Sequence, residues 1–113
     1  MQSTPQERLF EVYESYRQAY DRRAIDWKEC TTVAQAKSVA KNVDALETIY
    51  LQAAKQALET SSPSVELAYS AARQARADVD KAYQNAVALA ARIRLVGSVV
   101  SKVGDLIKKA TGK

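Results

Sequence analysis

The apolar residues in the first half of the chain recur every three or four positions, which is the spacing of one face of an α-helix. The first such stripe consists of Leu9, Tyr13, Tyr16, Tyr20, Ala24 and Trp27. After the β-branched pair Thr31-Thr32, a second stripe consists of Ala36, Val39, Val43, Leu46, Tyr50, Ala53 and Ala57. These stripes predict two helices, over about residues 5–29 and 33–60.

Capping residues mark where these two helices begin. Thr4 stands before Pro5 and three residues before Glu7, and Thr32 stands three residues before Gln35. This spacing is typical of a capping box, in which two side chains bond the free backbone N–H groups of the first helical turn. Proline at the first helical position also favours a helix start, because it has no N–H to leave unpaired.

A third and longer stripe begins after the turn residues 61–63. It consists of Val65, Ala68, Ala72, Ala75, Val79, Ala82, Ala86, Leu89, Ile93 and Val96, and continues with Val100, Val103, Ile107 and Ala110. We predict a third helix over about residues 63–96 and an amphipathic basic arm over about residues 97–110. The predicted fold class is all-α: a single domain, residues 1–113, forming an antiparallel three-helix bundle with alanine-rich heptad seams.

Helix lengths leave the place of the arm open. At about 1.5 Å per residue the first two helices would be ~38 and ~42 Å long, whereas residues 63–110 as one helix would reach ~72 Å. If the arm extends the third helix, its apolar face beyond about Leu95 projects past the neighbouring helices. That face needs a cover: the chain's own bundle, with the arm folded back as a fourth helix, a second copy, another protein, or a membrane surface.

Composition narrows the possible classes of protein. The 113 residues include three Gly and two Pro, too few for the many turns of an all-β fold. One cysteine and no histidine leave neither an intrachain disulfide nor a Cys/His zinc site. Because no signal peptide or membrane span is recognisable, we expect a cytoplasmic protein. The net charge of +4 is uneven, since residues 64–113 hold nine Lys/Arg against four Asp/Glu.

The arm is the first candidate for a functional surface. The residues expected to bind a partner are Val100, Val103, Leu106 and Ile107 on its apolar face and Lys102, Lys108 and Lys109 on its charged face. We expect a non-catalytic interaction module, such as an adaptor, accessory or inhibitor protein, that binds another protein or a second copy of itself. No cofactor, metal or small-molecule substrate is expected. Peripheral binding to an anionic membrane surface is an alternative.

A second alternative is weak, non-specific nucleic-acid binding. Arg73 and Arg76 are spaced to contact successive phosphates, and Lys81 adds a third positive charge to the same helix. Asp78 and Asp80 lie within one turn and would repel the phosphates. Nucleic acid is therefore the less expected partner.

The aromatic stripe of the first helix is predicted to belong to the core. Tyr13, Tyr16 and Tyr20 would fill the space left by small residues on the other helices, with their hydroxyl groups reaching the surface. A stacking strip for bases or a peptide is the alternative. Trp27 is expected to close one end of the bundle.

Two further groups offer little chemistry. Glu7, Glu11 and Glu14 form an acidic strip at the start of the first helix, where the helix dipole favours negative charge. A di-metal site in a helix bundle would also need histidines, which the chain lacks. Cys30 has no histidine to activate it as a nucleophile.

Overall fold

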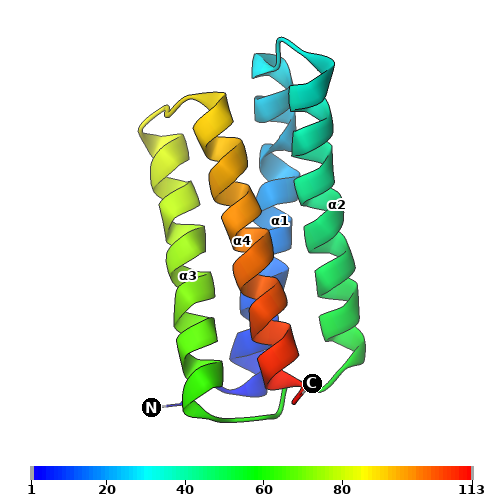
Figure 1. Ribbon diagram of the computed structural model, residues 1–113, viewed down its shortest axis with the longest axis vertical. Coiled ribbons are helices and arrows are strands. Elements are labelled where there is room, and N and C mark those ends of the chain that lie inside the picture. Colours follow the sequence, from blue (N-terminus) through cyan, green and yellow to red (C-terminus); the bar gives the residue numbers. More distant parts are fainter. Residues whose placement is uncertain (1, 113) are drawn as a thin grey trace.

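The computed structural model describes residues 2–112. Its helices are α1 (Pro5–Glu29), α2 (Val33–Lys55), α3 (Pro63–Gln84) and α4 (Leu89–Ala110), shown in Figure 1. Every regular element within residues 2–112 is an α-helix, which confirms the predicted all-α class. Residues 2–112 form four helices, because the C-terminal part of the chain folds back as a helix, the second of the two arrangements expected for the arm.

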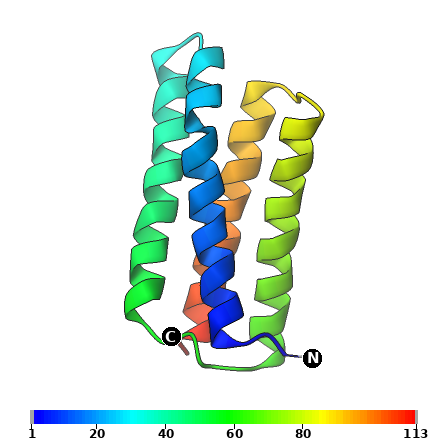
Figure 2. The same ribbon diagram turned by 180° about the vertical axis from the view of Figure 1, so that it is seen from behind.

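The four helices form two antiparallel hairpins, α1–α2 and α3–α4, packed side by side (Figures 1 and 2). The Cα atoms span 43 × 26 × 18 Å. The middle helices α1 and α4 each pack against all three others, whereas α2 and α3 lie at opposite edges and, within residues 2–112, do not contact each other. The connection over residues 56–62 crosses one end of the bundle, so that α2 runs parallel to its neighbour α4.

The predicted helix starts are confirmed. The Thr4 hydroxyl accepts a hydrogen bond from the Glu7 N–H (3.0 Å), and the Glu7 carboxylate accepts one from the Thr4 N–H (2.8 Å). The same reciprocal pair joins Thr32 and Gln35 at the start of α2. Ser62 caps α3 through its side chain. These starts depend on residues three positions apart, so the local sequence is sufficient to specify them.

The predicted end of the third helix at residue 96 is wrong. α3 ends at Gln84 in a Schellman motif, in which the Val87 N–H donates to the Ala82 carbonyl (3.0 Å). Ala86 has a φ of 50°, in the left-handed region that glycine usually occupies at this position. The sequence does not predict this helix end, because residue 86 is an alanine, the strongest helix former.

α2 also ends earlier than predicted, at Lys55 instead of residue 60. The chain leaves the helix so that Leu58 enters the core, where 2% of its surface is exposed. The Leu58 carbonyl accepts a hydrogen bond from the Arg8 guanidinium (2.6 Å). Ala57, predicted on the buried stripe, is exposed. The cause is non-local, since the anchor for residue 58 lies on α1.

α4 contains the predicted arm within a longer helix that begins at Leu89. α3 and α4 each have 22 residues, so α4 runs back along the whole of α3. Of the two arrangements left open for the arm, the structure has the one in which it folds back as part of a fourth helix, and the chain does not project beyond Leu95. Of the covers considered for the apolar face of the arm, the chain's own bundle is the one observed, with the break earlier than Gly97.

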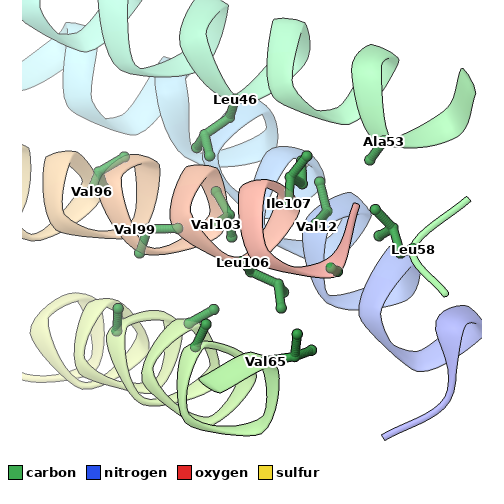
Figure 3. Packing of buried hydrophobic residues seen from close by; sticks show 14 of the residues in the cluster. Val12, Leu46, Ala53, Leu58, Val65, Val96, Val99, Val103, Leu106 and Ile107 are labelled. Carbon is green, nitrogen blue, oxygen red and sulfur yellow. The ribbon is translucent and has the colours of Figure 1, made fainter. Parts of the chain in front are cut away.

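The apolar core lies between α4 and the helices around it. Its most buried members are Val12, Leu46, Val65, Val103 and Leu106. Figure 3 shows Leu106 pointing toward α3 and Ile107 toward α1. The alanines of α3 leave room for these larger side chains of α4.

Candidate functional site

The structure separates the residues predicted to bind a partner into two groups. Val103 and Leu106 are fully buried in the core, so they are not available to a partner in this fold (Figure 3). Ile107 packs in the core as well, but 7% of its surface remains exposed. Val100 is half-buried, and the three lysines of the set are exposed. The buried face of α4 serves the bundle, and any docking surface on α4 must use its remaining sides.

One such side borders a groove between the parallel helices α2 and α4, with a volume of about 560 Å³. Its lining includes the apolar Ile49, Val100 and Ile107 and the polar Gln52, Lys102 and Lys108. We call this feature the α2–α4 groove. It brings together four of the seven residues predicted to bind a partner. Lys109 instead pairs with Asp105 (3.0 Å) along the same helix.

Two glycines lie on the side of α4 that borders the groove. A Cβ atom at Gly97 would lie 3.8 Å from Asn42 Oδ1, and one at Gly104 would lie 3.9 Å from Ile49 Cδ1. Both positions therefore face α2 without a side chain to fill the space between the helices. Because the two glycines are seven residues apart, they lie on the same face of α4, and that face lacks a side chain at both positions.

The α2–α4 groove has a positive border. Lys102 and Lys108 of its lining are exposed, and neither forms a salt bridge with any residue in the 2–112 range. The nearby carboxylate of Asp105 is already paired with Lys109. The lining of the groove is a mixture of apolar and polar residues, and its two lysines give the groove a net positive charge.

α1 buries a polar face that the apolar pattern does not predict. The predicted aromatic stripe is turned outward, with exposed fractions of 37% for Tyr13, 42% for Tyr20 and 44% for Trp27. The predicted core role is therefore wrong for Tyr13 and Tyr20, and Trp27 does not close the bundle. Tyr16 does pack against the core, and its ring stacks on that of Tyr50 with centroids 5.9 Å apart.

Ion pairs hold the polar face of α1 against α3 and α4. They are Arg8–Glu66 (3.3 Å), Glu11–Arg76 (2.7 Å), Arg22–Asp80 (2.7 Å), Asp26–Arg92 (3.0 Å) and Glu29–Arg92. The α1 members follow one another at steps of three, eleven, four and three, and because eleven residues make about three helical turns they share one face of the helix. That spacing is the feature of the sequence that could have predicted the buried polar face of α1. Charged residues, however, are normally assigned to the solvent side of a helix.

Asp26 is the centre of this network at the end of the bundle near the α3–α4 junction. It accepts a hydrogen bond from Arg92 (3.0 Å) and another from the Tyr83 hydroxyl. The guanidinium groups of Arg22 and Arg92 lie 4.5 and 4.8 Å from the Tyr83 ring centroid. Burial raises the pKa of Tyr83, and its hydrogen bond to Asp26 raises it further. Three helices are thus joined through one carboxylate.

The raised pKa of Tyr83 predicts a loss of stability at high pH. The folded state holds this phenol neutral, so its stabilising contribution is complete below the unfolded pKa of 10.0 and declines as pH rises above that value. We expect the free energy of unfolding to fall between about pH 9.5 and 11, measured by urea denaturation. Tyr83→Phe should flatten this decline. The matched variant Tyr20→Phe, which alters an exposed tyrosine, should leave it unchanged, and equal slopes for the two variants would contradict the assignment.

A small cavity of about 20 Å³ lies where the four helices meet. Ser15, Arg22 and Asn42 supply polar lining, opposite apolar residues such as Val79 and Val96. This space suits one water molecule and is far below the ~300 Å³ of a typical ligand pocket. A water there would have a donor to bind, since Arg22 Nη1 is buried without a hydrogen-bond partner among residues 2–112.

The remaining sequence candidates have structural partners. Each glutamate of the acidic strip has a structural partner. Glu7 accepts a hydrogen bond in the α1 cap, and Glu11 and Glu14 form ion pairs with Arg76 and Arg17 (both 2.7 Å). Within the described residues, no group of three or more metal-ligating side chains is gathered.

Of the other candidates, Cys30 caps the end of α1, and its thiol donates to the Asp26 carbonyl (3.3 Å). The pairing of Arg76 with Glu11 also removes it from the phosphate-binding pair predicted with Arg73.

Comparison with protein-family models, curated proteins and solved structures found no match to this chain. No helix in residues 2–112 is long and apolar enough to cross a membrane.

Proposed function

We propose that this chain is a non-catalytic protein-interaction module that binds an acidic amphipathic helix of another protein in the α2–α4 groove. The observation that supports this proposal is that three apolar side chains of the groove lie beside exposed lysines that have no acidic partner among residues 2–112. A lone cysteine without a disulfide partner favours the cytoplasm as the location.

The shape of the groove suits a helix. Two parallel helices leave between them a furrow into which a third helix can pack with its apolar side chains. Val100 and Ile107 are seven residues apart on α4, or about 10.5 Å along its axis. A docked helix repeats its apolar residues over the same distance at positions i and i+7. Ile49 of α2 would contact the residue between them.

The charge of the groove favours an acidic partner. Lys102 and Lys108 line the groove, and both are exposed. Glutamates flanking the apolar residues of a bound helix would meet these cations, which raises the association rate and makes binding sensitive to salt.

We expect binding to a designed probe to test this assignment. The probe is a fluorescently labelled amphipathic helix with leucines at positions i, i+3 and i+7 and glutamates on its flanks. The double variant Lys102→Glu/Lys108→Glu should weaken binding about tenfold in fluorescence anisotropy, because each charge contributes roughly 0.5–1 kcal/mol. The matched control Lys37→Glu/Lys81→Glu, with the same change in net charge at exposed positions outside the groove, should bind like the wild type.

Two further comparisons sharpen this experiment. Ser101→Trp should abolish binding by filling the groove, since Ser101 is exposed and lines it. A probe with lysines in place of the glutamates should not bind. If both probes bind equally, or if the control pair weakens binding as much as the groove pair, the assignment of the groove is wrong.

A membrane surface is the alternative class of partner. If the partner is a membrane, the protein should sediment with phosphatidylserine-containing vesicles, and the variant Lys102→Glu/Lys108→Glu should not. The acidic helical probe should then not bind. The apolar face that such an arm would insert is buried in the bundle, which favours the protein partner.

A further inference from the structure

The junction between α3 and α4, residues 85–88, is held in an unfavourable conformation. Ala86 lies in the left-handed region, with a φ of 50°, where the Cβ atom of an L-residue is crowded. Ala88, the residue before the first turn of α4, makes no side-chain capping hydrogen bond, whereas a side chain caps the start of each of the other three helices. The chain therefore turns here with neither the glycine nor the cap that would favour a turn.

The sequence across the junction favours a continuous helix. Residues 84–90 contain no glycine or proline, and four of these seven residues are alanine or leucine. The apolar spacing also passes through the junction, from Ala82 to Ala86, Leu89 and Ile93 in steps of four, three and four. In a straight helix these residues would share one face. Residues 63–110 thus have the sequence of one helix about 72 Å long.

Straightening the junction within one chain would expose the buried face of α4, including Val103 and Leu106. A second copy of the chain, straightened in the same way, can cover that face. We propose that two copies exchange α4, so that each α4 continues α3 of its own chain and packs in the bundle of the other. The partner is then a second copy of this chain, and the surface is the same apolar face that packs within one bundle.

Such an exchange preserves nearly all of the packing within each bundle. Arg92 would meet Asp26 and Glu29 in the other bundle, in place of the same residues in its own. The exchange breaks the interactions of the junction itself, such as the hydrogen bond from Arg92 to the Val87 carbonyl (2.9 Å) and the Schellman bonds. In return, residues 85–88 of both chains become helical. Figure 1 shows the junction at the end of the bundle that also carries the turn between α1 and α2.

The expected result is a dimer that forms when the chain is unfolded and refolded at high concentration. Exchange requires α4 to leave its own bundle, so the dimer should form slowly in native conditions and readily during refolding. Light scattering coupled to size-exclusion chromatography, from micromolar to millimolar protein, measures the dimer fraction. A chain that remains monomeric after refolding at millimolar concentration would overturn the proposal.

Substitutions in the junction separate exchange from ordinary surface association. Ala86→Gly suits the left-handed turn and weakens the straight helix, so it should raise the dissociation constant about a hundredfold or more. Asn85→Ala should lower it, because alanine favours the straight helix.

The matched control is Ala77→Gly, at an exposed site in the middle of α3 that is helical in both forms. It should lower the melting temperature without changing the dissociation constant. A dimer that responds equally to Ala86→Gly and Ala77→Gly would rule out exchange through this junction.

Discussion

Replacing Asp26 with alanine is expected to lower the free energy of unfolding by about 3 kcal/mol. The side chains of Asp26 and Arg92 are 8% and 5% exposed, so removing the carboxylate leaves a buried guanidinium without its closest buried partner. Glu29 still contacts Arg92, which keeps the loss toward the lower end of the range for broken buried pairs. The Tyr83 hydroxyl also loses its acceptor. Urea denaturation followed by circular dichroism measures the loss.

The second half of this experiment removes both charges. Arg92→Met alone should also cost about 3 kcal/mol, but Asp26→Ala/Arg92→Met should cost only ~4 kcal/mol, because no unpaired charge remains buried. The difference from the sum of the single variants is the coupling between the two residues. Strict additivity would show that the pair contributes nothing beyond the packing of each side chain, contrary to the geometry around Asp26.

The helix starts could be predicted from sequence, whereas the helix ends could not. Thr4 and Ser62 act on residues within one turn of themselves, so a short window contains all the information. The end of α3 depends on a left-handed Ala86, which the sequence would mark only if glycine stood there. The end of α2 depends on Leu58 meeting Arg8 of α1, a contact between distant parts of the chain.

The orientation of α1 could not be predicted for a related reason. Its apolar stripe and its polar face have the same periodicity, and burial of the aromatic residues was the simpler assumption. The structure reverses this assignment because Glu11 and Asp26 each find an arginine on another helix, at Arg76 and Arg92. Only the pairing across helices makes burial of these charges tolerable, and one-dimensional patterning contains no such information.

The candidate site was partly predictable. The lysines of α4 were expected at the surface and lie there, and Val100 remains accessible enough to line the α2–α4 groove. Val103 and Leu106 were assigned to a partner on the alternative in which the arm extends beyond its neighbours, but both are buried. Once α3 stops at Gln84, that face lies inside the bundle, so one misplaced helix end accounts for both errors.

Arg8 provides the second large effect. Its side chain is fully buried and donates to the Leu58 carbonyl (2.6 Å), the Ser3 carbonyl (2.7 Å) and the Glu66 carboxylate (3.3 Å). The Ser3 N–H, followed by its hydroxyl and by Arg8, keeps the pKa of Glu66 below its usual value. One guanidinium therefore joins the N-terminal segment, the connection between the hairpins and the start of α3.

Arg8→Met should lower the free energy of unfolding by about 3 kcal/mol, because two carbonyl groups lose their donor in a place that water reaches poorly. The connection around Leu58 should also lose amide hydrogen-exchange protection before the middle of α4 does, since Arg8 anchors that segment directly. Arg73→Met, at an exposed position, is the matched control and should cost less than ~0.5 kcal/mol. Equal losses for the two arginines would mean that the connection is anchored by Leu58 packing alone, and that the buried guanidinium adds no stability of its own.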